Sequence, residues 1–306
     1  MRVAVTGGCG FIGSHVVDQL LAAGHQVRVL DVGGGWRNPA AEYLTGDLFD
    51  PAALGHGVDG CAAVFHLAGA ANVNEVAADP VAAVRLNVEG TARVLDAART
   101  AGCGRVLLAS TVWVYGAASG PGELAEQAPV DLRRAGHVYV ATKLSAELLV
   151  HSYREMYGQH FTILRYGIPY GPRMREELVV ARFVRAALDG QPITIAGTGD
   201  QQRNYVYVTD LADAHVRALD PAATDQTLAL EGGAPVSVRE IADTVRELVR
   251  AVPVEYVPAR AADYQGVSVS SVLAKELLDW VPVTPFAEGV HRYLEWLADV
   301  RVAGAR

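Results

Sequence analysis

The sequence predicts an α/β fold, with a doubly wound Rossmann-like parallel sheet over the first half of the chain and a smaller C-terminal α/β lobe that would bind substrate. In the first half, short apolar runs alternate with longer helical patterns. These runs are continuously apolar, which is typical of strands buried on both faces of a parallel sheet. After Arg165 the alternation becomes less regular, and prolines and glycines cluster between residues 169 and 199. We therefore expect a first domain over residues 1–165 and a second lobe over 166–306, with elements near 205–230 returning to the first sheet.

The elements of the first half are expected to follow a repeated strand–helix order. Runs rich in valine, leucine and isoleucine predict strands, and spacings of three and four between apolar residues predict helices. The expected strands are 3–6, 27–31, 42–45, 62–66, 106–110 and 162–165, and the main helices are 13–23, 80–101 and 139–157. Right-handed connections between such strands wind helices over both faces of the sheet and leave ligands at the carboxyl ends of the strands.

The second half has fewer and shorter candidate elements. We expect helices over 178–188, 237–249 and 286–297, and strands over 193–195 and 205–208. The sequence contains no repeat, low-complexity tract or flexible linker, so the two lobes are expected to pack as one body with a cleft between them.

The composition argues against several classes of protein. The 306 residues carry a formal net charge of −8 without a basic run, which argues against a nucleic-acid or anionic membrane partner. Cys9, Cys61 and Cys103 lie far apart, which argues against a disulfide framework and against a zinc or other metal site. A strand is expected directly after Met1, and no run of about 18 apolar residues could span a bilayer. A cytoplasmic protein is therefore expected.

A glycine-rich turn joins the first expected strand to the first helix. Gly8, Gly10 and Gly13 match the pattern G-x-G-x-x-G, and Asp31 ends the second strand. Glycines allow the backbone to approach a pyrophosphate at the helix N-terminus. Asp31 can accept hydrogen bonds from ribose hydroxyls and would repel a 2′-phosphate, so the pattern predicts NAD rather than NADP. Asp47, after the third strand, is a candidate for the adenine edge or else a helix-capping or turn aspartate.

Tyr139 and Lys143 lie one turn apart on the same face of an expected helix. A free phenol has a pKa of about 10. A nearby ammonium, together with a positive nicotinamide ring, would favour the phenolate and make Tyr139 a base. Ser110 and Thr111 end the preceding strand, where a hydroxyl could hydrogen-bond the reacting oxygen. Taken singly, such a pair is more often an amphipathic surface pair, and such hydroxyls are more often strand-end caps.

In this order the motifs resemble the extended short-chain dehydrogenase/reductase family, and within it the nucleotide-sugar epimerase/dehydratase branch. The resemblance runs nearly end to end. In the first half it rests on Thr6-Gly7-x-x-Gly10-x-x-Gly13, His66-Leu67-Ala68-Gly69, Asn87-x-x-Gly90-Thr91, Ser110-Thr111-x-x-Val114-Tyr115-Gly116 and Tyr139-x-x-x-Lys143. In the second half it rests on Leu164-Arg165-Tyr166, Tyr170-Gly171-Pro172-Arg173, the segment 197–210 with Arg203, and Arg260-x-x-Asp263.

The resemblance implies a role for each of these segments. Thr111, Tyr139 and Lys143 would be the catalytic residues. The NAD contacts would come from Gly7, Gly10, Phe11, Ile12, Gly13, Asp31, Asp47, Leu48, Leu67, Ala68, Gly69, Asn87, Ser110, Tyr139, Lys143 and Tyr166. The nucleotide-sugar contacts would come from Thr111, Trp113, Tyr139, Arg203, Arg260 and Asp263. The two arginines suit a diphosphate, because guanidinium forks bind phosphate oxygens in pairs. The chain departs from the family at Ile168 and Asn204, where relatives often carry Asn and Asp.

The two residues after Thr111 discriminate among the reactions of this branch. Val112 and Trp113 stand where the 4,6-dehydratases carry an Asp-Glu pair and where the glucuronate decarboxylases usually carry Glu at the second position. Neither residue can do proton chemistry, so the resemblance favours C4 epimerisation of a nucleotide-diphosphate sugar, a UDP-hexose or a TDP-hexose, through a transient 4-keto intermediate. Trp113 could border the sugar or simply pack beside it.

The alternatives are a dehydrogenase or ketoreductase with net redox and, less favoured, a 4,6-dehydratase, a decarboxylase or a non-catalytic NAD sensor. The resemblance also implies a homodimer that pairs the helices expected over 80–101 and 139–157.

Overall fold

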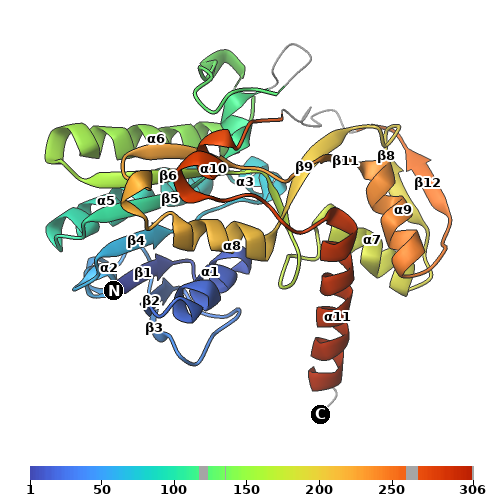
Figure 1. Cartoon of the computed structure of the whole chain (residues 1–306), viewed down its shortest axis with the longest axis horizontal. Helices are drawn as coiled ribbons and strands as arrows, with labels where there is room; N and C mark the ends of the chain where they lie inside the picture. Colours follow the sequence, from blue (N-terminus) through green and yellow to red (C-terminus); the bar gives the residue numbers. More distant parts are fainter. Residues whose placement is uncertain (117–122, 135, 260–267, 305–306) are drawn as a thin grey trace.

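A computed structural model of the chain describes residues 1–116, 123–134, 136–259 and 268–304 (Figure 1). A seven-stranded sheet with helices on both faces forms the larger domain, and a second lobe of short strands and helices lies beside it (Figure 1). The predicted α/β fold with a parallel central sheet is therefore confirmed.

The central sheet is parallel throughout, with the strand order β10-β6-β5-β4-β1-β2-β3. Val3 of β1 pairs with Val27 of β2 on one side and with Ala63 of β4 on the other. The strand order reverses at this point, and doubly wound sheets bind ligands at such a switch point. The strands are β1 (Arg2–Thr6), β2 (Gln26–Asp31), β3 (Glu42–Thr45), β4 (Ala63–His66), β5 (Arg105–Thr111), β6 (His160–Tyr166) and β10 (Gln226–Leu230).

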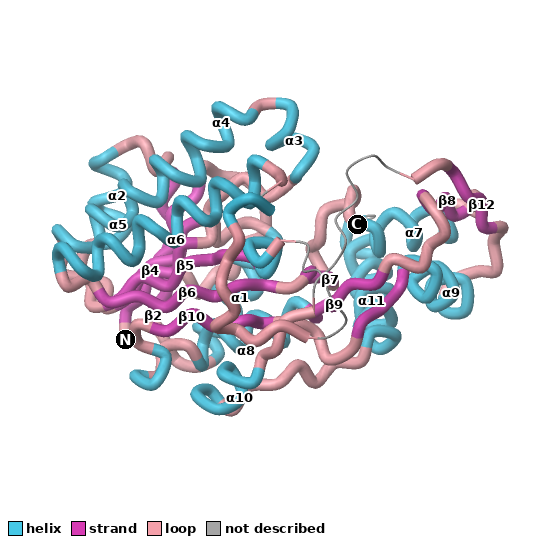
Figure 2. The backbone as a smooth tube through the Cα atoms, turned by 90° about the horizontal axis from the view of Figure 1, so that it is seen from above, coloured by secondary structure: helices cyan, strands magenta, loops and turns pink. Residues whose placement is uncertain are grey.

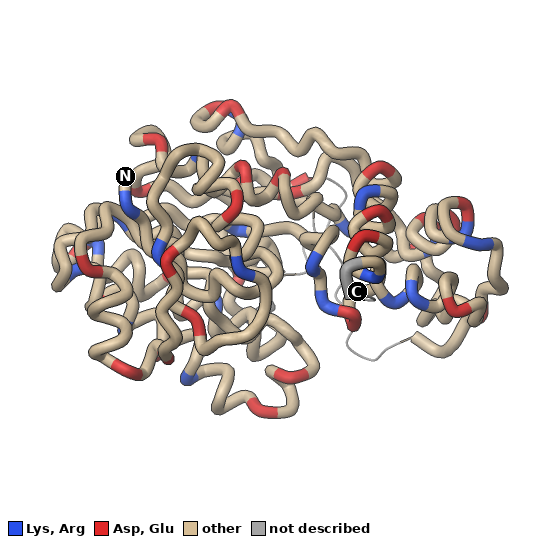
Figure 3. The backbone as a smooth tube through the Cα atoms, turned by 90° about the horizontal axis from the view of Figure 1, so that it is seen from below, with Lys and Arg blue, Asp and Glu red and all other residues tan. Residues whose placement is uncertain are grey.

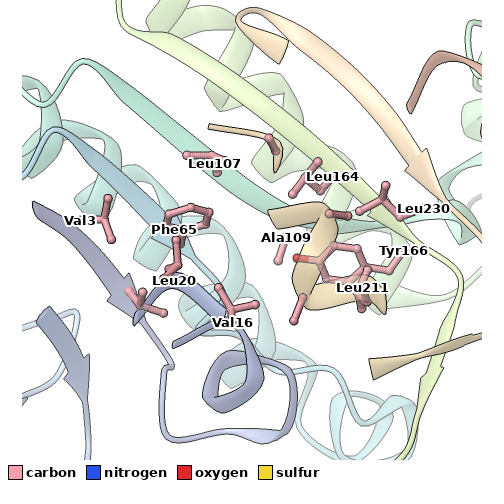
Figure 4. Close-up of a cluster of buried hydrophobic side chains, with 14 of the residues drawn as sticks. Val3, Val16, Leu20, Phe65, Leu107, Ala109, Leu164, Tyr166, Leu211 and Leu230 are labelled. Atoms are coloured by element: carbon pink, nitrogen blue, oxygen red, sulfur yellow. The ribbon is translucent and has the colours of Figure 1, made fainter. Parts of the chain in front are cut away.

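Helices cover both faces of this sheet. On one face lie α1 (Phe11–Ala22), α8 (Val208–Arg217) and α10 (Val272–Leu278), and the other face carries α2 (Pro51–Val58), α3 (Val73–Ala78), α4 (Pro80–Val84), α5 (Gly90–Thr100) and α6 (Val138–Tyr157). Val3 and Phe65 pack with the residues of α1 and α8 (Figure 4), whereas their neighbours Ala4 and Val64 pack with α2, α5 and α6. Because successive side chains of a strand point to opposite faces, a sheet covered on both faces needs continuously apolar strands.

The helix expected over residues 80–101 is interrupted. α4 ends at Val84, a π-helical turn covers Arg85–Glu89, and α5 begins at Gly90. The π turn is centred on Asn87, which is buried. Helical residues flank the π turn on both sides without a break in the chain, so the sequence pattern predicts a single helix here.

Two small sheets and several helices make up the described part of the second lobe (Figure 2). One sheet contains β7 (Ile168–Tyr170), β9 (Gln202–Tyr207) and β11 (Pro235–Ser237), and the other pairs β8 (Ile193–Ala196) with β12 (Val254–Val257). The helices are α7 (Val179–Leu188), α9 (Val238–Leu248) and α11 (Phe286–Gly304). Residues of these elements form a core of their own.

The strand expected over 205–208 is displaced toward the N-terminus. β9 covers Gln202–Tyr207, and Val208 is already the first residue of α8. From there the chain returns to the first domain, because α8 packs against α1 and β10 pairs with β6, with Leu228 opposite Leu164.

Acidic and basic residues are interspersed along the backbone of both lobes (Figure 3). Many belong to short-range ion pairs on helices, such as Arg93 with Glu89 at 2.7 Å. Among the described residues, none of the helices combines the length and the apolar character that a bilayer span requires.

Candidate active site

The glycine-rich turn lies between β1 and α1, at the carboxyl end of the central strand. Gly7 has a φ of +72°, and a Cβ there would lie 2.7 Å from the backbone N of Ala68. A Cβ at Gly13 would lie 2.1 Å from the carbonyl O of Gly7, so only glycine lets α1 pack this closely on the turn. Gly10 is exposed, and a Cβ there would meet only the carbonyl O of Gly7, at 3.3 Å.

The N-terminus of α1 has the donor set that a pyrophosphate requires. Gly10 is the N-cap residue and supplies no side-chain hydrogen bond, and the first turn contains no acidic residue. The amides of Phe11, Ile12 and Gly13 belong to the first turn, where backbone N–H groups have no partner within the helix. The helix dipole adds a positive potential at this end. A dinucleotide therefore fits the turn.

Asp31 ends β2 beside this turn. Its Oδ2 accepts a hydrogen bond from the backbone N of Cys9 at 3.0 Å, and its Oδ1 accepts one from Gly33 at 3.3 Å. A carboxylate offers about four lone-pair sites. The carboxylate thus shapes the turn and retains the capacity to accept hydrogen bonds from ribose hydroxyls.

Asp47 acts as a turn aspartate in the structure. Its side chain is exposed, and Oδ1 accepts from the backbone N of Phe49 at 3.1 Å. The N-cap of α2 is instead Asp50, whose side chain accepts from two first-turn amides. The adjacent Leu48, a candidate cofactor contact, is buried in the core beneath α2 and α5.

A chain of hydrogen bonds fixes the end of β4 beside the turn. Thr91 Oγ1 donates to the carbonyl O of Asn87 at 2.6 Å, so it accepts from Nε2 of His66 at 3.0 Å. The Nδ1 of His66 then accepts from Thr6 Oγ1 at 2.8 Å. Burial lowers the pKa of His66 to about 3, in agreement with this neutral ring. The candidate cofactor segment 67–69 follows directly.

Asn87 connects the π turn to the segment after β4 and to α6. Its Oδ1 accepts from the backbone N of Ala70 at 2.7 Å, and its Nδ2 donates to the Ala70 carbonyl and to Thr142 Oγ1, both at 2.9 Å. A Cβ at Gly69 would lie 2.9 Å from Asn87 Oδ1 and 3.4 Å from Lys143 Nζ. The structure therefore brings Gly69, Asn87 and Lys143 together.

Tyr139 lies in the first turn of α6, next to the end of β5. Its phenol hydrogen-bonds the side chain of Thr111, and its ring meets that of Trp113 edge to face, with centroids 6.2 Å apart. Burial raises the pKa of Tyr139 to about 12, while the hydrogen bond from Thr111 and the charge of Arg175 act in the opposite direction. The protein's own groups thus leave the pKa of this phenol raised, and its acidification by the Lys143 ammonium together with a nicotinamide ring stays a prediction.

Lys143 is directed toward the backbone of β5. Its Nζ donates to the carbonyl O of Ala109 at 3.0 Å, and the residue is only 8% exposed. Burial lowers the pKa of Lys143 to about 8, and the negative charge of Glu147 opposes this change. An ammonium has three donors, so Lys143 retains donors for a ligand.

A buried network lies behind Lys143. Glu147 Oε1 accepts from Ser110 Oγ at 2.5 Å and from Arg165 Nε at 3.0 Å, while Oε2 accepts from Arg165 Nη2 at 2.6 Å. The guanidinium of Arg165 lies 4.8 Å from the ring centroid of Tyr115. Ser110, a candidate cofactor contact, therefore donates its hydroxyl proton to a protein carboxylate.

Tyr166, another candidate cofactor contact, directs its hydroxyl into the core. The hydroxyl donates to His215 Nε2 at 2.6 Å, and His215 Nδ1 donates to the Leu211 carbonyl at 2.8 Å. Figure 4 shows the Tyr166 ring beside Leu211 among buried apolar side chains. Burial raises the pKa of Tyr166 well above its ordinary value. Its ring, rather than its hydroxyl, is left for a cofactor contact.

The candidate diphosphate residues belong to the second half of the chain. Arg203 lies on β9, on the sheet of the second lobe. Arg260 and Asp263 fall outside the described residues. Asn204, where the chain departs from the family, donates from Nδ2 to Ser268 Oγ at 3.3 Å.

Two charged residues of the site were missed in the sequence. Glu147 continues the stripe of Tyr139 and Lys143 by one more helical turn, so its place on that face could have been found from spacing. Arg175 comes from the segment between β7 and α7, and no pattern in the sequence marks its approach to Tyr139.

Comparisons with known proteins identify the family of the chain. Residues 3–229 match the model of a family described as the NAD dependent epimerase/dehydratase family. The UDP-glucose 4-epimerase of Mycolicibacterium smegmatis is 33% identical over 311 residues, covering 97% of this chain and 98% of that protein. A UDP-N-acetyl-alpha-D-glucosaminuronate decarboxylase of Bacillus cytotoxicus is 28% identical over 317 residues and covers 98% of both chains.

The fold also matches a solved structure over nearly its full length. The crystal structure of the UDP-glucose 4-epimerase of Thermus thermophilus in complex with NAD has a TM-score of 0.88 and 31% identity, covering 97% of this chain and 99% of that chain. The names of these proteins include both epimerases and a decarboxylase. The chain is therefore similar to proteins named for different reactions.

Proposed function

Because the chain belongs to the NAD-dependent epimerase/dehydratase family, as its motifs predict, we propose that it inverts C4 of a nucleotide-diphosphate sugar with NAD as cofactor. The observation that carries this proposal is the pair of side chains after Thr111. Val112 is buried, and Trp113 packs against the ring of Tyr139. Eliminating water from a sugar needs a further acid and base at the reacting carbons, whereas inversion at C4 needs one group that takes and returns a proton.

Tyr139 is that group. Its phenolate would accept the proton of the C4 hydroxyl, and the resulting phenol would return it, while Thr111 hydrogen-bonds the same oxygen. Since burial raises the pKa of Tyr139 to about 12, the phenolate depends on positive charge, which Arg175 supplies in part. When bound, NAD would supply the hydride chemistry at C4, with removal from one face and return to the other, so that the cycle would have no net redox change.

The remaining residues bind and orient. The first-turn amides of α1 would hold the pyrophosphate, Asp31 the adenosine ribose and Lys143 the nicotinamide ribose. Arg203 and Arg260 would bind the diphosphate of the substrate, which can be that of a UDP-sugar or a TDP-sugar.

The test is a product analysis with purified protein. UDP-glucose, UDP-glucuronate and TDP-glucose are incubated separately with the protein and NAD, and the sugars are followed by proton NMR. The expected product is the C4 epimer, with no change in absorbance at 340 nm. Loss of water or carbon dioxide, or consumption of NAD in proportion to product, would assign one of the other reactions of the family.

We further propose a homodimer formed through α4, α5 and α6. Large apolar side chains are exposed on two of these helices: Val81 (78%) and Val84 (46%) on α4, and Leu148 (63%) and Met156 (70%) on α6. Leu148 and Met156 are eight residues apart and share one helix face. Apolar side chains grouped on one surface of a globular protein favour a protein interface.

A further inference from the structure

The loop between β2 and β3 meets the C-terminal helix of the second lobe through two tryptophans. The rings of Trp36 and Trp296 have centroids 5.5 Å apart and an interplanar angle of 62°. The guanidinium carbon of Arg173 lies 5.4 Å from the centroid of the Trp36 ring. On the other side, Trp296 stacks on Tyr293, which is buried in the core of the second lobe. The loop between β2 and β3 and the helix α11, which are far apart in the sequence, are therefore in contact.

Asp18 of α1 binds two of these segments at once. Its Oδ1 accepts from Asn38 Nδ2 at 2.8 Å, and its Oδ2 lies 2.8 Å from Arg173 Nη1. One turn earlier, His15 donates from Nε2 to the carbonyl O of Pro172 at 2.9 Å. Arg173 itself has a φ of +65°, a conformation that a residue with a side chain keeps only when its surroundings enforce it. α1 thus fixes both the loop after β2 and the segment after β7.

The same loop is also attached to the glycine turn. The backbone N of Trp36 donates to the carbonyl O of Cys9 at 3.0 Å, and the backbone N of Cys9 donates to Asp31 Oδ2 at 3.0 Å. A Cβ at Gly35 would lie 2.1 Å from the carbonyl O of Cys9, so the loop backbone lies directly on the turn. A single residue, Cys9, therefore connects Trp36 with the carboxylate that would hold the ribose.

We infer that the contact of Trp36 with Trp296, supported by Arg173, is a clasp between the second lobe and the cofactor turn that slows release of the dinucleotide. Release requires the dinucleotide to break its contacts with Asp31 and with the glycine turn. Movement of the loop between β2 and β3 weakens both sets of contacts. An enzyme that regenerates its cofactor in every cycle gains from slow release, because loss of the cofactor stops turnover. This inference rests on the proposed NAD site and adds Trp36, Arg173 and Trp296 as positioning residues.

The test is the rate at which NADH leaves the variants Trp36→Ala and Trp296→Ala. Each protein is loaded with NADH, an excess of NAD is added, and the decay of bound-NADH fluorescence is recorded. We expect release to be about fivefold faster in each variant, because each substitution removes the interaction of one aromatic pair. The double variant should release NADH no faster than either single variant, because the two residues share one contact. Val300→Ala, an exposed position on the same helix, is the control and should keep the wild-type rate.

The possible failures are distinguishable. Wild-type rates in both tryptophan variants, or effects that multiply in the double variant, would overturn the clasp while leaving the proposed cofactor site intact. Wild-type protein that binds no NADH would overturn the site and the clasp together. Hydrogen exchange of the protein without NADH provides a second measurement, in which Trp296→Ala should speed exchange in residues 33–38. Unchanged exchange there would also overturn the clasp.

Discussion

Glu147 and Arg165 form a two-point ion pair in the core of the first domain, one helical turn beyond Lys143. The two hydrogen bonds are 3.0 and 2.6 Å long, and the side chains are 5% and 11% exposed. The pair holds a negative charge at a fixed place behind Lys143, and the same carboxylate accepts from Ser110. Glu147 is therefore positioned to act through Lys143 on the proposed chemistry.

Glu147→Gln should move the alkaline limb of the pH profile of kcat/KM to lower pH. The charge of Glu147 raises the pKa of Lys143 against burial, which lowers it to about 8. Without that charge the pKa of Lys143 falls further, so the ammonium is lost nearer neutral pH. Glu155→Gln, an exposed position on the same helix, is the control. If the alkaline limb of the pH profile stays at the same pH in a folded variant, the role of the ion pair is purely structural.

Tyr139→Phe should lower kcat by about 10²- to 10⁴-fold with little change in KM. The substitution removes the proton-transferring hydroxyl but keeps the ring that contacts Trp113. Steady-state kinetics of the proposed epimerisation measure the effect. Tyr157→Phe, at the exposed end of α6, should be indistinguishable from wild type. Turnover close to wild type in the Tyr139 variant would assign the proton transfer to another group.

Asp31→Asn should weaken binding of NAD and reduce the preference for NAD over NADP. The amide oxygen can still accept from the N–H of Cys9, so the turn keeps its shape. The charge that repels a 2′-phosphate is lost, and the ratio of the two Kd values should change by about tenfold. Calorimetric titration with each cofactor checks this, with Asp243→Asn on α9 as control. A constant ratio would remove Asp31 from cofactor selection.

Leu148→Glu should convert the proposed dimer to a monomer. The side chain of Leu148 is 63% exposed on α6. In the proposed dimer interface a glutamate at this position would be buried as a charge without a partner. Light scattering after gel filtration gives the mass of each species. Val272→Glu, also at an exposed apolar side chain but on α10, which covers the opposite face of the sheet, should not change the mass. A monomeric wild-type protein would refute the dimer directly.

His66→Asn should destabilise the protein less at pH 5 than at pH 7. The unfolded ring has a pKa of about 6.5, and burial lowers the pKa in the folded protein to about 3. The contribution of the neutral folded ring to the free energy of unfolding is therefore complete above pH 6.5 and is lost as the pH falls toward 3. At pH 5 this loss lowers the free energy of unfolding of the wild-type protein by about 2 kcal/mol, whereas the variant has no ring at this position and is unaffected. Guanidinium unfolding of both proteins at the two pH values measures the difference, and a constant difference would contradict it. The exposed His291→Asn serves as control.

Local features of the site could be predicted from the sequence. The glycine turn, Asp31 and the pair of Tyr139 and Lys143 each depend on residues that are close in the chain, where spacing alone defines geometry. The central strands were also predictable, since each is a continuous apolar run.

Features that depend on distant segments could not be predicted. Arg165 meets Glu147 because β6 lies beside β5 under α6, and the approach of Arg175 to Tyr139 depends on the path of the second lobe. The short strands β7 and β11 span three residues each, too few to show a period. Asn87 in the π turn hydrogen-bonds Ala70 and Thr142, which come from other segments of the chain.

The pairing of β10 with β6 has a consequence for how the chain matures. β10 comes after the whole of β7, β8 and β9, yet it completes the edge of the first sheet, with Ile163 opposite Thr227. A chain cut after residue 165 would expose the apolar edge of β6, with its unpaired N–H and C=O groups, to other chains. On the ribosome the first domain stays unfinished until residues 226–230 have been synthesised, and during that interval it is most vulnerable to aggregation.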